Sequence, residues 1–421
     1  MNLLHRFLLV LFLQFHTLSA QVMTYASPES VGMSTERIDN LTTVLQNYVD
    51  SDQLAGAVAL VARKNKIVYF EAVGQRDKAN NSPMQTDAIF RIASQTKALV
   101  SVGIMILQEQ GKLLISDPVG KYISEFQNTQ VAVPNENGGY TLEKSKRPIT
   151  LRDLLTHTAG IGYGNGIASD LWEKAEIQGW YFAHRDEPVL ETIKRMGSLP
   201  FDAHPGEKYV YGYNTDILGG VIEVASGQSL EDFLQTHILD PLGMNDTHFY
   251  LPKNKVNRLA TVYSSTDEGI VRAPDEGTMV SQGAYVDGPR KSFSGGAGYL
   301  STAMDYARFL QMMLNGGSFN GKRILSRKSV ELMVTDHWDK TKINNSNGTG
   351  FGLGFSVVND LGLRGQLGSE GEFGWGGAYH STYWVDPKEE LVVVYFTQLL
   401  PAHSIDDHGK LRTQVYQAII D

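Results

Sequence analysis

The sequence contains no cysteine. This absence excludes disulfides, thiolate nucleophiles, Fe–S clusters and cysteine-ligated zinc. It also excludes the lipid anchor of bacterial lipoproteins, because that anchor is attached to a cysteine at the processing site. The redox and metal chemistry that depends on thiolates is therefore closed to this chain.

An excess of basic residues is also missing. The 421 residues include 37 Lys+Arg and 46 Asp+Glu, which gives a net charge of −9. Contact with a phosphate backbone needs a basic face, so the sequence predicts no nucleic-acid partner. Hydrophobic residues make up 42% and charged residues 20% of the chain, as in an ordinary soluble globular protein.

Long apolar runs are absent, since no segment approaches the roughly 18 uninterrupted apolar residues of a membrane-spanning helix. The run Phe7–Leu13 is short, follows the basic His5-Arg6 and precedes the small residues Ser19-Ala20. This order is typical of a secretory signal peptide. We therefore expect residues 1–20 to be removed and the mature protein to lie in the periplasm or outside the cell.

Several catalytic motifs are missing as well. The sequence has no G-x-S-x-G nucleophile elbow, no Walker A loop and no H-E-x-x-H pair. His403 and His408 flank Asp406 and Asp407, a spacing that suggests a metal, but a solvated start of a helix explains it better. We expect no metal and no organic cofactor.

The pattern of elements predicts an α+β fold. Strand patterns occur early, at Gly56–Ala62 and Ile67–Val73, and late, at Gly352–Val358, Ala378–Val385 and Leu391–Gln398. Helical patterns fill the middle, and helices begin near Ser34 and Lys410. We expect one domain over residues 21–421, with an antiparallel sheet of about five strands from residues 21–93 and 331–421. Residues 94–330 form a mainly helical insertion, and the terminal helices cover the sheet.

One short motif carries chemistry, Ser94-Gln95-Thr96-Lys97. On a helix, positions i and i+3 share a face, so Lys97 can reach the hydroxyl of Ser94. A serine becomes a good nucleophile when a neighbouring base takes its proton, and the start of a helix favours a developing oxyanion. An N-cap serine followed by a surface lysine would produce the same four letters, so the motif alone leaves both interpretations open.

Six ordered blocks resemble a known family. They are FRIASQTKALVSVGIMILQEQGKLLISDPVGKYI from Phe90, ITLRDLLTHTAGI from Ile149, PGEKYVYGYNTDILGGVIE from Pro205, DPLGMNDTHF from Asp240, SGGAGYLSTAMDYARF from Ser294 and GWGGAYHSTYWVDP from Gly374. Together they resemble serine hydrolases of the class C β-lactamase superfamily. That group includes penicillin-binding proteins, D-aminopeptidases and family VIII esterases, and it implies the β-lactamase/transpeptidase-like fold.

The resemblance also implies site residues. Ser94 matches the nucleophile, Lys97 the base and Tyr211 the tyrosine that relays protons to the leaving group. The expected oxyanion hole consists of the backbone N–H groups of Ser94 and Ala378. A buried aromatic role for Tyr211 is the alternative.

Two departures from the β-lactamase pattern concern the substrate. Tyr213 stands where β-lactamases carry the asparagine that contacts an acylamide side chain. Trp375-Gly376-Gly377 replaces a Lys-Thr-Gly element, so a cation for a β-lactam carboxylate is lost and an apolar wall is gained. We expect Trp375 and Tyr213 to line the substrate site, and Gly376 and Gly377 to let the substrate approach the strand, unless these glycines only form a bulge.

Two histidines tempt a Ser-His interpretation. His157 ends a predicted helix before Thr158-Ala159-Gly160, and we interpret it as structural. His380 follows the third element and receives no catalytic role, because no residue of the family pattern matches it.

The leading hypothesis is therefore a secreted serine hydrolase, most simply a carboxylesterase for short-acyl or small esters that acts through an acyl-enzyme on Ser94. The alternative is an amide hydrolase of the β-lactamase, DD-peptidase or D-aminopeptidase type, and a further one is a non-enzymatic binding protein on the same scaffold. The expected partner is a small ester or amide. The natural substrate and the oligomeric state stay open.

Overall fold

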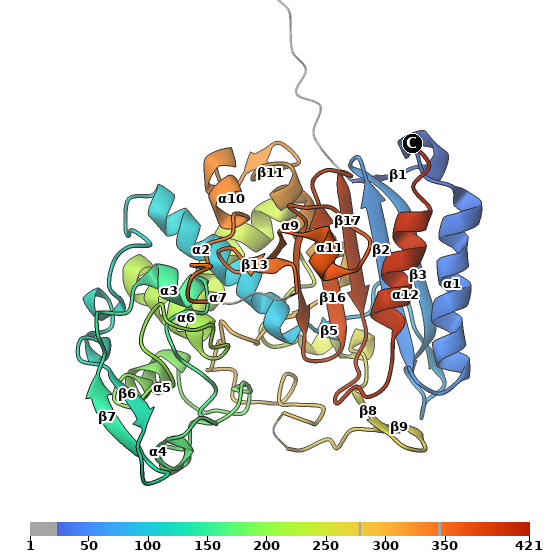
Figure 1. The fold of residues 1–421 in the computed structure, drawn as a ribbon. Helices are drawn as coiled ribbons and strands as arrows, with labels where there is room; N and C mark the ends of the chain where they lie inside the picture. Colours follow the sequence, from blue (N-terminus) through green and yellow to red (C-terminus); the bar gives the residue numbers. More distant parts are fainter. Residues whose placement is uncertain (1–22, 278, 344–346) are drawn as a thin grey trace, which may run out of the picture.

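A single large sheet dominates the fold. The computed structural model describes residues 23–277, 279–343 and 347–421 (Figure 1). In the described residues, nine strands form the sheet in the order β1-β3-β2-β17-β16-β15-β14-β13, with β4 paired to β3. The strands are β1 (Thr24–Tyr25), β2 (Gly56–Arg63), β3 (Lys66–Asp77), β4 (Ser82–Pro83), β13 (Thr349–Phe351), β14 (Ser356–Val358), β15 (Phe373–Gly377), β16 (Ser381–Asp386) and β17 (Leu391–Phe396). The predicted signal peptide lies outside the described residues.

The fold class is confirmed, and the sheet is larger than expected. All pairings except the parallel pair β1–β3 are antiparallel. The predicted strand Gly352–Val358 covers only β14 and the turn that joins it to β13, because Gly354 takes a φ of +93° that breaks the extended chain. The sequence does not predict β15 as a strand, because FGWGG has three glycines among five residues and glycine is depleted in strands.

The two early strand patterns form a hairpin. β2 and β3 join through Lys64-Asn65, and both residues have positive φ angles, +49° and +64°. Two consecutive left-handed residues match the right-handed twist of the flanking strands. The sheet order thus places the N-terminal hairpin directly beside β17 from the other end of the chain.

Helices cover both faces of the sheet. On the outer face α1 (Thr35–Asp50) and α12 (Asp407–Gln417) lie side by side (Figure 1). The side chain of Ser34 caps α1 by accepting from the N–H of Arg37. On the inner face α9 (Ala303–Leu314) packs against β2, β16 and β17, so the mainly helical part also supplies a helix that covers the sheet.

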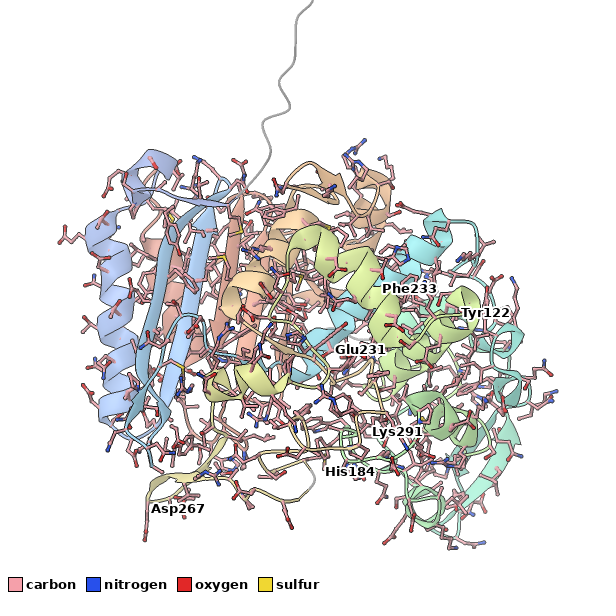
Figure 2. The ribbon with its side chains drawn as sticks, turned by 180° about the vertical axis from the view of Figure 1, so that it is seen from behind. Tyr122, His184, Glu231, Phe233, Asp267 and Lys291 are labelled. Carbon is pink, nitrogen blue, oxygen red and sulfur yellow. The ribbon has the colours of Figure 1, made fainter. Side chains whose placement is uncertain are left out.

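The mainly helical part contains most of the remaining helices and three short hairpins. Its helices are α2 (Thr96–Glu109), α3 (Leu151–Leu155), α4 (Ser169–Lys174), α5 (Val189–Met196), α6 (Asn214–Ser226), α7 (Leu230–Leu234), α8 (Asp240–Leu242) and α10 (Arg327–Met333); α11 (Leu361–Arg364) lies between β14 and β15. Short hairpins are β6–β7 (Gln130–Pro134, Tyr140–Lys144), β8–β9 (Tyr263–Thr266, Gly269–Arg272) and β11–β12 (Ser318–Phe319, Lys322–Arg323). Asp267 marks the exposed tip of β8–β9 in Figure 2.

One hydrophobic core joins the two parts. It runs from the inner face of β2 and β17 through α2, which is buried over most of its length, to α6. A two-stranded ladder of β5 (Phe90–Arg91) and β10 (Leu300–Ser301) fixes the segment before α2. None of the described helices combines the length and apolar character that crossing a bilayer requires.

Candidate active site

The candidate nucleophile lies at the start of α2. Ser94 is half-buried and belongs to a short 3-10 helix (Ala93–Gln95) that leads directly into α2. Ala93 has a φ of +41°, which an alanine adopts only at a cost, so the preceding chain turns sharply into the helix. Backbone N–H groups at a helix start face the region where an oxyanion would form.

Lys97 lies one turn further on, as the i, i+3 spacing predicts. Its Nζ is 3.2 Å from the Oγ of Ser94, and the side chain is only 2% exposed. The same Nζ donates to the carbonyl oxygen of Gly296 at 2.7 Å. This position puts the amine within reach of the proton on the Ser94 hydroxyl. The alternative of a surface lysine is wrong.

The buried carboxylate of Asp216 fixes the position of the lysine amine indirectly. Asp216 accepts from the Ser294 hydroxyl at 2.6 Å and from the N–H of Gly296 at 3.0 Å. Gly296 in turn accepts from Lys97, so the carboxylate fixes the backbone that orients the amine. Burial raises the pKa of Asp216, while the charge of Lys97 acts to lower it. The sequence analysis did not single out Asp216, although it lies inside the block that begins at Pro205.

Tyr211 is brought to the same place. Its ring lies under the amine of Lys97, with Nζ 4.7 Å from the ring centroid. Its hydroxyl accepts from the indole N–H of Trp375 at 3.2 Å. A chain of contacts therefore links Ser94 to Lys97, Lys97 to Tyr211 and Tyr211 to Trp375, and the catalytic roles of these residues stay predictions.

A second tyrosine, Tyr163, was missed by the sequence analysis. Its hydroxyl is 3.3 Å from the Nζ of Lys97, and its ring packs edge-on against that of Tyr211. Burial, with the nearby Tyr211 and Asp216, raises its pKa well above the usual value, so Tyr163 stays protonated at neutral pH. It stands two residues beyond the block that begins at Ile149, and no local spacing links it to Lys97.

Tyr213 requires a correction. We expected it to line the substrate site, but its side chain is fully buried and stacks on Trp172 at 5.7 Å. Its hydroxyl donates to the carbonyl oxygen of Gly179 at 2.7 Å. The side chain of Tyr213, which directly precedes α6, therefore points into the core. The ring also packs edge-on against Tyr163 and thereby supports that residue. The side chain of the next residue, Asn214, bonds to His157.

The third element lies on β15, at the edge of the nucleophile segment. A Cβ on Gly377 would stand 2.5 Å from the carbonyl oxygen of Ile92, so only glycine lets the strand approach so closely. Ala378 follows at the turn into β16 and is partly exposed. This approach brings Ala378 and Ser94 onto neighbouring segments, as an oxyanion hole made of two backbone amides requires.

Aromatic rings form one wall of the site. Trp375 packs against Tyr211 at 5.6 Å and against Phe351 at 5.2 Å. Trp338 extends the wall, stacked on Phe351 and close to Tyr209 at 4.9 Å. Trp375 and Trp338 are partly exposed, whereas Phe351 is buried.

His157 is structural, as the sequence indicates. It is buried, and its Nδ1 accepts from the amide of Asn214 at 3.0 Å. Burial and the charge of Lys97 hold its pKa well below the usual value, so the ring is neutral. Its ring centroid lies 4.7 Å from that of Tyr211, so the buried imidazole packs against the tyrosine ring.

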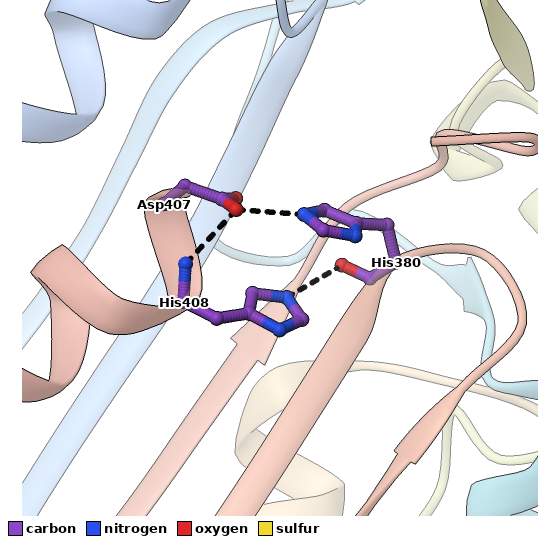
Figure 3. Close-up of side chains that lie close together, drawn as sticks. All are labelled: His380, Asp407 and His408. Atoms are coloured by element: carbon purple, nitrogen blue, oxygen red, sulfur yellow. Dashed lines mark hydrogen bonds and ion pairs between the residues drawn. The ribbon is translucent and has the colours of Figure 1, made fainter. Parts of the chain in front are cut away.

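One group of described residues has the composition of a metal site. His380, Asp407 and His408 place ligand atoms within 4.8 Å of one another (Figure 3). These atoms already bond to each other or to the backbone, so we assign them no metal. His403 lies apart, beside a surface hollow with Ser51 and Asp267. The expected solvated helix start is wrong for Asp407, which is fully buried because Tyr395 and His380 both donate to it.

Comparison with known proteins places this site in a family. The model of the Beta-lactamase family matches residues 41–417. Protein Rv1367c of Mycobacterium tuberculosis is 32% identical over 382 residues, which cover 88% of this chain and 92% of that protein. Esterase EstB of Burkholderia gladioli is 30% identical over 391 residues, covering 89% and 94%.

A solved structure agrees over the same length. EstCE1, described as a hydrolase with promiscuous acyltransferase activity, superposes with a TM-score of 0.79 at 25% identity. The match covers 90% of this chain and 99% of that one. The chain therefore belongs to the Beta-lactamase family, and it is a serine hydrolase.

Proposed function

We propose that the protein is a secreted carboxylesterase for short-acyl or small esters. The observation that carries this proposal is the contact of Lys97 Nζ with Ser94 Oγ at 3.2 Å, beside a wall formed by Trp375. The similarity to a relative named as an esterase, EstB, supports it.

In the proposed acylation, Ser94 Oγ bonds to the ester carbonyl carbon and its proton passes to Lys97 Nζ. The carbonyl oxygen becomes an oxyanion that accepts from the N–H groups of Ser94 and Ala378. The bond to the alcohol oxygen then breaks, and this oxygen takes a proton that Tyr211 relays from Lys97. A water molecule then attacks the carbonyl carbon of the acyl-enzyme, and Lys97 takes a proton from it. The bond to Ser94 Oγ breaks, the acid is released, and the proton returns to Ser94 Oγ.

The wall beside Trp375 decides between ester and amide substrates in this proposal. A β-lactam or a peptide stem carries a carboxylate, and its recognition needs a cation where the indole of Trp375 stands. A short ester carries none, and its apolar parts gain by contact with the partly exposed ring of Trp375.

The first prediction concerns substrate ranking. The kcat/KM for p-nitrophenyl butyrate should exceed that for nitrocefin by about 100-fold, since losing a charged hydrogen bond costs up to about 3 kcal/mol. Both rates are measured by absorbance on one preparation, with Trp375→Phe as the control that keeps the apolar wall. Faster turnover of nitrocefin would replace the esterase proposal with the amide hydrolase. Turnover of neither would favour the binding protein.

Secretion is a separate part of the proposal and rests on the order of residues in the first twenty positions. Protein recovered from the periplasm or medium of an expressing bacterium should begin at Gln21. Intact mass spectrometry checks this, because cleavage removes the mass of residues 1–20. A full-length mass in the cytoplasm would contradict secretion and leave the esterase proposal untouched.

A further inference from the structure

The turn that contains the expected oxyanion donor, the N–H of Ala378, is stabilised by contacts outside the active site. Ala378, Tyr379 and His380 connect β15 to β16, and His380 has a φ of +58°. This left-handed conformation is unfavourable for a residue with a Cβ, so other contacts must stabilise it. Those contacts come from the start of α12 (Figure 3) and from Thr397, which directly follows β17.

A buried carboxylate binds the imidazole of this turn. The Nε2–H of His380 donates to Oδ1 of Asp407 at 2.7 Å, and this carboxylate is fully buried. Oδ1 also accepts from the N–H of His408, and Oδ2 accepts from the hydroxyl of Tyr395 at 2.7 Å. Burial acts to raise the pKa of Asp407, but the bond from His380 and its neighbours lower it overall, so the carboxylate stays ionised.

The backbone of the same residue is held as well. The hydroxyl of Thr397, which directly follows β17, donates to the carbonyl oxygens of His380 at 2.7 Å and Tyr379 at 3.0 Å. The ring of His408 stacks on that of His380 at 4.1 Å and donates to its carbonyl oxygen at 3.3 Å. Burial and the adjacent His380 lower the pKa of His408, so the ring of His408 stays neutral at neutral pH.

We propose that His380 is a positioning residue, and that its bond to Asp407 fixes the turn so that the N–H of Ala378 points at the developing oxyanion. This inference rests on the proposed function, because it needs Ala378 to act in an oxyanion hole. His380 itself lies two residues away and touches no reacting atom in this proposal. A hydrogen-bond donor stabilises an oxyanion only when its direction is set before the reaction, so a loose turn costs catalysis.

The test separates the imidazole from the backbone conformation. His380→Gly tolerates the positive φ but loses the bond to Asp407. It should lower kcat for p-nitrophenyl butyrate by about tenfold to 100-fold with KM nearly unchanged, because the oxyanion exists only in the transition state. His380→Gln places an amide N–H near the position of Nε2 and should restore most of the rate. His403→Gly, at an exposed histidine outside the turn, is the matched control and should behave as the wild type.

Asp407→Ala combined with His380→Gly should lose no more kcat than Asp407→Ala alone, because the bond between His380 and Asp407 is already absent in that single variant. Wild-type kcat in His380→Gly would overturn the proposal, and so would a loss that His380→Gln does not rescue. A change confined to KM or to the melting temperature would also overturn it. Ser94→Ala and the wild type are measured beside these variants. An inactive wild type would refute the proposed function, whereas an active wild type with an equally active His380→Gly refutes only the positioning role.

Discussion

Ser94→Ala should reduce hydrolysis of p-nitrophenyl butyrate by at least about 1,000-fold, to a level set by the remaining backbone donors and the bound geometry. The reason is direct: the proposed covalent intermediate is an ester of this oxygen. Little else changes, because Lys97 keeps its bond to Gly296 and its contact with Tyr163. The free energy of unfolding should therefore shift by no more than about 1 kcal/mol.

A serine on the same helix provides the matched control. Ser101 is buried on α2, and its hydroxyl has no hydrogen-bond partner among the described residues. Ser101→Ala should leave kcat unchanged, while Ser94→Ala abolishes turnover. A fluorophosphonate should add one mass increment to the wild type and to Ser101→Ala, and none to Ser94→Ala. Turnover by Ser94→Ala, or an adduct on another residue, would contradict the acyl-enzyme on Ser94.

The parts of the site that the sequence predicts are those that local geometry determines. Ser94 and Lys97 meet because three residues on a helix bring them to one face, and the cap at Ser34 and the turn at Lys64-Asn65 follow from equally short spacings. The order of strand and helical patterns likewise predicts the fold class. The number of strands is underestimated, because β1, β4 and β13 have only two or three residues each and the glycines of β15 hide its strand pattern.

The parts that the sequence does not predict join distant segments. Tyr163 meets Lys97 across 66 residues, and Asp216 reaches Lys97 through Gly296. Tyr213 precedes α6 in an irregular segment, where no periodicity tells which way a side chain points, and it faces the core. Such contacts depend on how the helical part folds against α2, which spacing along the chain does not reveal.

Lys97→Arg should be nearly as inactive as Lys97→Met, with kcat reduced by about 100-fold to 10,000-fold in both. A guanidinium keeps the positive charge near Asp216 and Gly296, but it stays protonated and accepts no proton from Ser94. The pair therefore separates proton transfer from charge. Near wild-type kcat in Lys97→Arg would show that the charge alone suffices, and the rate of fluorophosphonate labelling should fall in parallel with turnover.

The two variants should differ in stability with pH, through Asp216. Burial already raises the folded-state pKa of this carboxyl, and Lys97 acts to lower it. Losing the charge in Lys97→Met raises that pKa further, so the folded state binds its proton more tightly than the unfolded state over a wider pH range. Stability then declines as pH rises through this range, and the decline should be steeper in Lys97→Met than in Lys97→Arg. Melting temperatures between pH 5 and pH 8 measure the difference. Identical pH slopes would mean that Lys97 does not stabilise the Asp216 carboxylate, which would remove the electrostatic link between the base and its support.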